Sequence, residues 1–229
     1  MVNFHNIQHE KYLQFCYSFF HFIDDQTGLF LVYGNGKMSN RTEDTSRAEY
    51  YENSPWYKSK SNIKYVKIES GITYIGEVFF KYSEMNTLMI GNTVTTIGKI
   101  AFSNCQKLTT LLIGENVSEI GQYAFDVNPS LTTLILPSSL KKIGKGAFTG
   151  TELIASLIIP SSVNYIDESA FSYCTSLTIV TFNGLSEPKT CNQIAFNEHN
   201  SSLSISVPQN YVDDYFCSIS VSKKTKCDK

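Results

Sequence analysis

The chain has 229 residues, of which 42% are hydrophobic and 17% are charged, and its formal net charge at pH 7 is −2. This length allows one or two domains with a sizeable core, and the hydrophobic content is not that of a membrane protein. Because there is no excess of basic residues, the sequence argues against binding to nucleic acid or to an anionic membrane surface. No apolar run approaches the ~20 residues that a membrane-spanning helix needs.

Residues 1–26 are rich in aromatic side chains and show no clear period. Their longest apolar run, Tyr12–Ile23, resembles the hydrophobic core of a signal peptide. However, Asp24 and Asp25 follow it where a small-residue cleavage site would be expected. We therefore expect no signal peptide and leave this N-terminal segment unassigned.

Residues 27–60 contain a predicted short strand, the polar stretch Ser39–Ser54 and the motif Pro55-Trp56-Tyr57. They precede a long array of repeats. The end of such an array would otherwise present open strand edges and apolar core to water. We therefore interpret residues 27–60 as an N-terminal cap.

Residues 61–208 are organised as about six repeats of 22–25 residues. In the clearest copies an Ile-Gly pair is followed by Ala-Phe, and the frame returns every 23 residues: Ile97-Gly98 with Ala101-Phe102, Ile120-Gly121 with Ala124-Phe125, Ile143-Gly144 with Ala147-Phe148, and Ile166-Asp167 with Ala170-Phe171. A weaker first copy contains Phe80, and a last copy ends at Phe196. Other aligned columns are Leu88, Leu111, Leu134, Leu157 and Val180, and Ile72, Val94, Val117, Leu140 and Val163.

Each repeat predicts one coil of a solenoid. Around Leu111 and Ile113 apolar residues alternate as in a strand, and a turn signal such as Gly114-Glu115-Asn116 follows. A second short extended piece leads to Gly-x-x-Ala-Phe, which we expect to form a brief helical or 3₁₀ turn. One coil cannot bury its own apolar side, so the coils should stack about 4.8 Å apart. We predict a β-rich α/β solenoid with parallel strands stacked in a right-handed coil.

The predicted core follows from the same columns. The phenylalanines of successive repeats should stack beneath one another and form its thickest part. Gly98, Gly121 and Gly144 should lie at a sharp corner where a Cβ would be unfavourable. Residues 209–229 are expected to form a C-terminal cap and a Lys-rich tail.

The repeat resembles the BspA-like, or treponemal-type, leucine-rich repeat. Leu134–Leu140 and Ile158–Val163 carry the strand and proline turn of that pattern, and Cys105–Leu108 and Cys174–Leu177 carry its linker. The flanks match as well, since Gly28–Met38 resembles the family's entry segment. The resemblance covers about residues 27–217 and implies a leucine-rich-repeat solenoid.

The same resemblance implies a function and a place. The family is known mainly from surface or secreted proteins of bacteria and of protist parasites, with roles in adhesion. It therefore implies a non-enzymatic module at the cell surface or outside the cell, binding a host cell-surface or matrix protein or a second copy of itself. The missing export signal and anchor leave a cytoplasmic scaffold with the same fold open as the alternative.

A candidate binding face follows from the strand alternation. If Leu111 and Ile113 point into the core, their neighbours point outward. Stacked, the outward residues form an apolar column beside a column of hydroxyls: Met89, Leu112, Ile135 and Ile158, next to Thr87, Thr110, Thr133 and Ser156. A contiguous exposed apolar stripe often marks an interaction site, although β-branched and apolar residues also suit an exposed strand.

The six cysteines do not form a metal-binding pattern. Cys105 and Cys174 are three repeats apart, which would separate their sulfur atoms by ~14 Å, too far for a disulfide. We interpret them as small side chains packed at a corner of the coil. Cys191, Cys217 and Cys227 could pair near the C-terminal cap if the protein is exported, and the sequence leaves their redox state open.

No arrangement of residues indicates catalysis. His5 and His9 have the i, i+4 spacing that can hold a metal on a helix, but no third ligand accompanies them. Gly34-x-Gly36 and Gly144-Lys145-Gly146 lack the strand–loop–helix frame of a phosphate-binding loop. No nucleophile and base or pair of carboxylates stands out. We expect no catalytic site, no metal and no cofactor.

Overall fold

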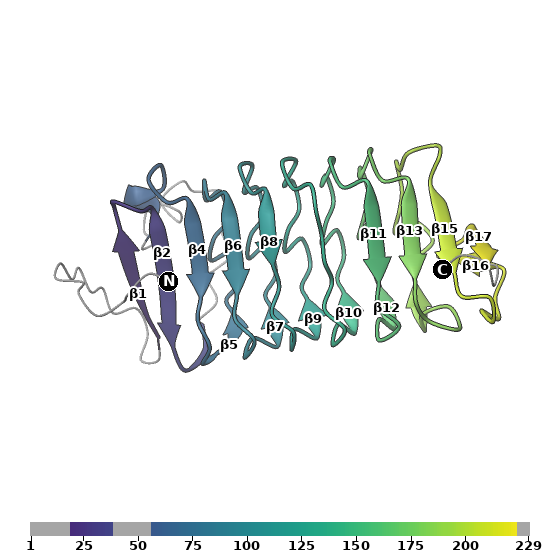
Figure 1. The fold of residues 1–229 in the computed structure, drawn as a ribbon, viewed down its shortest axis with the longest axis horizontal. Coiled ribbons are helices and arrows are strands. Elements are labelled where there is room, and N and C mark those ends of the chain that lie inside the picture. The colour runs from purple at the N-terminus through teal and green to yellow at the C-terminus, as the bar shows by residue number, and fades with distance from the viewer. Residues whose placement is uncertain (1–18, 39–55, 224–229) are drawn as a thin grey trace.

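The computed structural model describes residues 19–38 and 56–223 of the chain (Figure 1). These residues wind into one row of coils that lie side by side along the long axis of the molecule. Strand β1 (Phe19–Asp24) lies at one end of the row, and β16 (Tyr215–Phe216) and β17 (Ile219–Lys223) lie at the other. The predicted class, a β-rich solenoid of stacked parallel strands, is confirmed.

The front strands, which face the viewer in Figure 1, form two five-stranded sheets. Neighbouring strands are parallel, except in the terminal pairs β1–β2 and β16–β17 of the described chain. The first sheet contains β1, β2 (Leu29–Gly34), β4 (Tyr65–Ile68), β6 (Thr87–Ile90) and β8 (Thr110–Leu112). The second contains β11 (Ser156–Ile159), β13 (Ile179–Phe182), β15 (Ser204–Val207), β17 and β16.

A second side of each coil contributes a short strand to a seven-stranded parallel sheet. Its register places Ile97 beside Ile120, Ile120 beside Ile143, and Ile143 beside Ile166. Residues 23 positions apart in the sequence therefore lie next to each other in neighbouring coils. The strands are β3 (Gly36–Lys37), β5 (Ile72–Ile75), β7 (Thr96–Ile97), β9 (Glu119–Ile120), β10 (Lys142–Ile143), β12 (Tyr165–Ile166) and β14 (Thr190–Cys191).

The third side of each coil carries the Gly-x-x-Ala-Phe motif and consists of turns, where the sequence predicted a brief helical or 3₁₀ turn. In five of the six turns two residues, four positions apart, have left-handed backbone angles, for example Ile100 at φ 57° and Asn104 at φ 59°; in the last turn Glu198 has such an angle. Left-handed residues interrupt a right-handed helix. The N–H groups of Ile100, Phe102 and Asn104 instead donate to carbonyl oxygens of the next coil at 2.8–2.9 Å. In the described residues helical structure is limited to the 3₁₀ helix η1 (Tyr57–Ser59), before the first repeat.

The core is a continuous stack of aromatic rings, as predicted. Phe80, Phe102, Phe125, Phe148, Phe171 and Phe196 follow one another with ring centroids 5.1–5.6 Å apart and interplanar angles of 4–14°. All six side chains are buried. The coils are therefore held in register by ring-on-ring contact as well as by backbone hydrogen bonds.

The repeated glycines lie where the backbones of neighbouring coils come closest. A Cβ built on Gly121 would be 2.9 Å from the carbonyl carbon of Gly98, and one on Gly98 would be 2.6 Å from the carbonyl oxygen of Ile75. Backbone atoms cannot move aside as a flexible side chain can. The predicted cost of a Cβ at these corners is thus explained by close approach between coils.

Both ends of the solenoid are closed by side chains or strands outside the repeats. At the first coil the indole N–H of the buried Trp56 donates to the carbonyl oxygen of Phe79 at 2.8 Å. Phe79 occupies the place of Ala101, whose carbonyl accepts from the preceding coil. Trp56 therefore supplies the donor that a preceding coil would supply. At the other end β17 pairs in parallel with β15, in the position of a further coil.

Removing one ring from the middle of the stack should be costly. We expect Phe125→Ala to lower the free energy of unfolding by about 3–5 kcal/mol, because the cavity would lie between two coils that cannot collapse independently. Urea unfolding followed by circular dichroism measures this loss. Thr110→Ala, at an exposed front position, is the control and should change stability by less than about 0.5 kcal/mol. A loss below about 1 kcal/mol for Phe125→Ala would contradict the stacked core.

Candidate binding face

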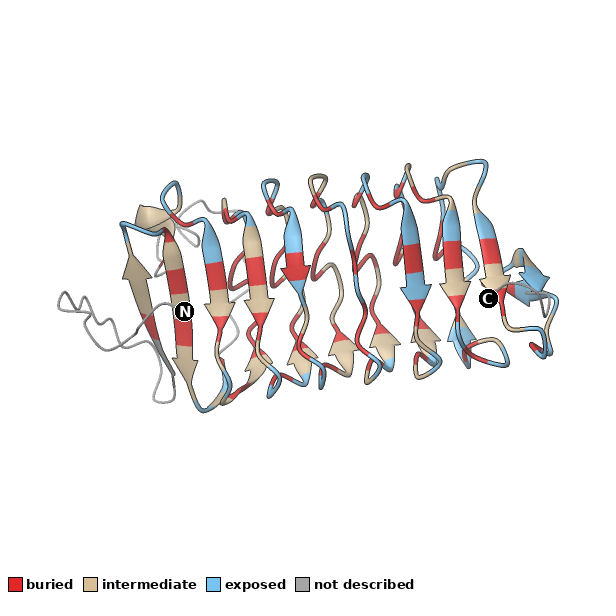
Figure 2. Ribbon diagram, in the orientation of Figure 1, coloured by how far each residue is buried: buried red, intermediate tan, exposed pale blue. Residues whose placement is uncertain are grey.

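The front strands present alternate side chains to the core and to solvent (Figure 2). In β11, for example, Leu157 and Ile159 are buried whereas Ser156 and Ile158 are exposed. The same alternation in β6 and β8 turns Leu88 and Leu111 inward. This follows from the two-residue period of a strand, so the parallel register carries each outward position from one coil to the next.

The outward positions form two neighbouring columns. The first, which we call the apolar strip, consists of Met89, Leu112, Ile135 and Ile158. Met89 pairs with Leu112, and Ile135 bridges to Ile158. Leu112, Ile135 and Ile158 are 52%, 68% and 60% exposed, and Met89 is half-buried. Other aliphatic side chains of the chain, such as Leu153 and Leu185, are also more than half exposed, but Leu112, Ile135 and Ile158 fall on consecutive coils.

The second column, which we call the hydroxyl ladder, consists of Thr87, Thr110, Thr133 and Ser156. Thr87 pairs with Thr110, and Thr110, Thr133 and Ser156 are exposed. All eight residues predicted for the binding face therefore point outward on consecutive coils.

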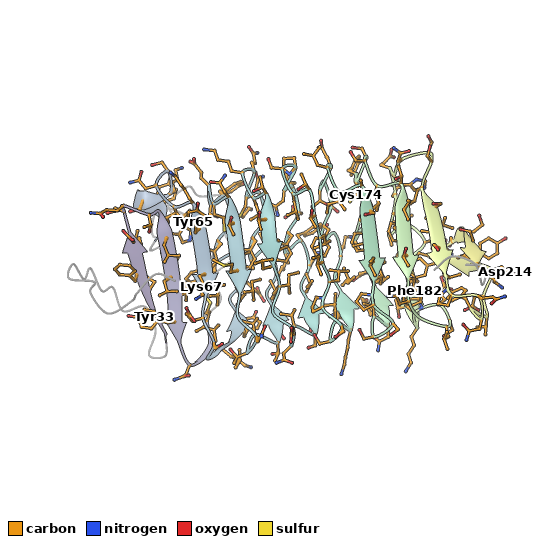
Figure 3. The ribbon with its side chains drawn as sticks, in the orientation of Figure 1. Tyr33, Tyr65, Lys67, Cys174, Phe182 and Asp214 are labelled. Carbon is orange, nitrogen blue, oxygen red and sulfur yellow. A yellow bond between two sulfur atoms is a disulfide. The ribbon has the colours of Figure 1, made fainter. Side chains whose placement is uncertain are left out.

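The two columns end in different surroundings. Tyr65 and Lys67, labelled on β4 in Figure 3, pair in register with Thr87 and Met89 of β6. Lys67 forms an ion pair with Glu69 at 2.7 Å. At the other end Ile179, which is 49% exposed, pairs with Ser156. The sequence prediction did not include Tyr65, although the 22-residue step from Tyr65 to Thr87 places it in the same column. The face thus has the Lys67–Glu69 ion pair at one end and the aliphatic Ile179 at the other, with the apolar strip and the hydroxyl ladder between them.

The front surface is interrupted in its middle. β8 is the last strand of the first front sheet, and β11 begins the second. The intervening coil contributes a single bridge, through Ile135, to the coil of β11. Ile135 is also the most exposed member of the apolar strip. The repeat pattern gave no sign of this interruption, because Thr133 and Leu134 fit the consensus as well as their counterparts do.

The histidines and the glycine-rich segments that the sequence offered as possible ligand sites do not belong to this face. Between 19 and 38 and between 56 and 223, no three His, Cys, Asp or Glu side chains gather as metal ligands would. His5 and His9 lie outside the described residues. His21 is buried and stacks on Phe30 at a centroid distance of 5.3 Å. Gly146 has φ 59° within a repeat turn, which accounts for that glycine without a phosphate.

Cys105 and Cys174 belong to a buried polar column beside the phenylalanine stack. Between them lie Asn128 and Thr151, both fully buried. The Asn128 side chain accepts from the Cys105 N–H at 2.8 Å and donates to two backbone carbonyls. Thr151 Oγ1 lies 3.2 Å from the Cys174 sulfur atom. Both cysteines are free thiols, as predicted, and they pack as small polar side chains.

Burial should make these two thiols unreactive in the folded protein. Desolvation raises the pKa of Cys105 to about 12 and that of Cys174 to about 11. Because the thiolate is the reactive form, very little of it is present at pH 8. We expect iodoacetamide to leave both residues unmodified in the native protein and to modify both in denaturant, as measured by peptide mass mapping. Rapid native alkylation of either residue would contradict its burial.

Cys191 and Cys217 form a disulfide bond, with their Cα atoms 4.9 Å apart. The bond joins the end of β14, in the last coil, to the residue that follows β16 in the terminal hairpin. The sequence left the redox state of Cys191, Cys217 and Cys227 open, and Cys227 lies outside the described residues. The disulfide therefore ties the C-terminal cap to the solenoid.

Comparison with known proteins agrees with this geometry. The model of the BspA type leucine rich repeat region matches residues 52–178 and 123–223, in six copies. The chain belongs to the BspA-type leucine-rich repeat family. Leucine-rich repeats of this type are generally protein-interaction modules, and a fold of this kind is generally non-enzymatic. A search of curated proteins gave no match.

Three solved structures of bacterial leucine-rich repeat proteins are similar to the chain. The Eubacterium ventriosum protein has a TM-score of 0.63 and 20% identity, over 85% of this chain and 65% of that one. The Treponema pallidum protein TpLRR has a TM-score of 0.53 and 18% identity, over 82% and 80%. The Bacteroides ovatus protein has a TM-score of 0.54 and 23% identity, over 86% and 48%. At these identities the likeness shows the shared fold.

The chain spans less than two thirds of the Eubacterium ventriosum protein and about half of the Bacteroides ovatus protein. Within the part of the chain that the structure describes, no helix is long and apolar enough to cross a membrane.

Proposed function

We propose that this BspA-type repeat chain is a non-enzymatic adhesion module at a cell surface. It binds a partner protein through the apolar strip and the hydroxyl ladder. The observation that carries the proposal is the run of exposed aliphatic side chains on successive coils, from Leu112 to Ile158. Isolated exposed apolar residues are common, but a contiguous row of them is typical of an interaction site.

The shape of the face also supports a protein partner. The side chains stand on strands whose inward neighbours are locked in the core, so the face is preorganised and loses little conformational entropy on binding. Thr110, Thr133 and Ser156 lie beside the strip and can exchange hydrogen bonds with water for hydrogen bonds with a ligand. An aliphatic centre beside polar groups is the usual anatomy of a protein–protein contact.

The proposed location draws support from the Cys191–Cys217 disulfide. Structural disulfides persist in oxidising compartments such as the cell exterior, and cytosolic proteins rarely keep them. Buried Cys105 and Cys174 are compatible with either compartment, since both are shielded from oxidants.

Substitution of the strip should separate binding from folding. We expect the triple variant Leu112→Ser, Ile135→Ser, Ile158→Ser to lose its partner while its melting curve stays nearly unchanged, because these side chains are already in water. Pull-down from host-cell extracts and matrix proteins, with mass spectrometry, measures the loss.

The matched control replaces three exposed apolar residues outside the front strands, Leu153→Ser, Leu185→Ser and Ile194→Ser. This variant should keep the partner. Capture of the same proteins by both variants would show that the apolar strip is not needed for binding. A large loss of stability in the strip variant would instead mean that these side chains belong to the core.

The redox state of the cysteines tests the location. In protein isolated from its native cells without reductant, we expect the peptides of Cys191 and Cys217 to be joined and those of Cys105 and Cys174 to carry free thiols. The disulfide closes a loop with a sequence separation of 26 residues, so its reduction should lower the free energy of unfolding by about 3.5 kcal/mol. Free Cys191 and Cys217 in such protein would favour the cytoplasmic scaffold.

A further inference from the structure

The side chains of the apolar strip recur at a nearly constant distance along the solenoid axis. Successive phenylalanine rings in the core are 5.1–5.6 Å apart. Paired parallel strands on the front, such as those of Met89 and Leu112, are about 4.8 Å apart. Between the coils of Leu112 and Ile135, where the front strands do not pair, the stacked rings of Phe125 and Phe148 are 5.4 Å apart. A ligand that lies along the axis therefore meets one aliphatic side chain about every 5 Å, at Met89, Leu112, Ile135 and Ile158.

This period distinguishes between the regular conformations of a polypeptide ligand. An α-helix advances about 5.4 Å per turn and presents one side chain of an i, i+3, i+4, i+7 stripe at each turn. A β-strand repeats its face about every 6.6 Å, and a polyproline II helix about every 9.3 Å. The α-helix is the conformation that can contact every coil of the strip in turn.

The charge of the face sets the chemistry of that helix. The four strand segments that carry the strip contain no charged residue: Asn86–Gly91, Thr109–Gly114, Thr132–Pro137 and Ala155–Pro160. Lys67 borders them, and its charge is paired with Glu69 at 2.7 Å. A charged side chain that docked here would lose water without gaining a partner of opposite charge. The complementary surface is therefore an uncharged helical face, aliphatic over the strip and small or amide-bearing over the hydroxyl ladder.

The size of the strip favours a narrow partner over a second copy of this chain. Four aliphatic side chains offer on the order of a few hundred Å², whereas a stable protein pair buries about 800 Å² on each partner. A helix about 10 Å across fits the width of a four-residue strand segment, which is about 13 Å long.

We propose that the partner presents an amphipathic α-helix, which lies along the solenoid axis and places one apolar side chain on each coil from Met89 to Ile158. This inference rests on the proposed function of the same face. Recognition then rests on the apolar face of the helix, which supplies aliphatic anchors one turn apart.

Display selection against the folded protein tests the conformation of the ligand. Two peptide libraries of equal composition and length would be used, one with apolar residues at i, i+3, i+4 and i+7 in a helix-forming background, the other with apolar residues at alternate positions in a strand-forming background. Enriched peptides would be synthesised, and their affinities for the wild type, the strip variant and the three-residue control variant measured by isothermal titration calorimetry.

We expect the enriched peptides to come from the helical library, to become helical on binding, and to lose at least tenfold in affinity for the strip variant but not for the control variant. If strip-dependent binders come from the alternating library, the helical inference is overturned and the proposed binding face stands. If no enriched peptide depends on the strip, both are overturned.

Discussion

Contact between successive coils is the interaction on which the rest of the structure depends. Successive coils hydrogen-bond through the short strands of the second sheet and through the turns that contain residues such as Ile100 and Asn104. Front strands add further hydrogen bonds, except where the front sheet is interrupted beside Ile135. Phenylalanine rings fill the space between these three sides at spacings of 5.1–5.6 Å. No coil has a core of its own, so each is stable because it covers the next. The ends are the exceptions, and Trp56 and β17 occupy the positions that further coils would take.

The candidate binding face is a consequence of this stacking. Because strands alternate between inward and outward side chains, a fixed register converts a repeated sequence position into a straight column on the surface. When one face of a sheet is buried and the other is in water, the outward side chains are usually polar. Here the segments between Asn86 and Pro160 that form the face carry aliphatic as well as hydroxyl side chains, while ion pairs such as Glu119–Lys142 lie on the second sheet. In these four coils the uncharged front surface and the ion pair lie on different sides of the coil.

The interior is not uniformly apolar, and its polar groups follow the same stacking rule. Asn128 is fully buried, and its side chain makes three hydrogen bonds to backbone groups of its own coil and the preceding one. Thr151 and the two free thiols continue the column. A buried polar side chain that satisfies backbone groups costs little, whereas one left without partners would be strongly destabilising. These residues therefore join the coils where the turn leaves carbonyl groups facing inward.

The sequence by itself determined the period, the parallel stacking, the phenylalanine core and the residues of the front face, because each of these is a repeated local pattern. The tertiary structure alone decided four other features. The turns at Gly-x-x-Ala-Phe are left-handed at positions such as Ile100 because their N–H groups bond to the next coil, and a helical turn would keep those bonds within the segment. The front sheet is interrupted at Thr133–Leu136, although its consensus is intact. Trp56 caps the first coil across 23 residues, and Cys217 reaches Cys191 only when the terminal hairpin folds back onto the last coil. The turns, the Trp56 cap and the disulfide depend on contacts between segments that are distant in sequence, which no local pattern of residues encodes; the interruption of the front sheet has no counterpart in the repeat pattern.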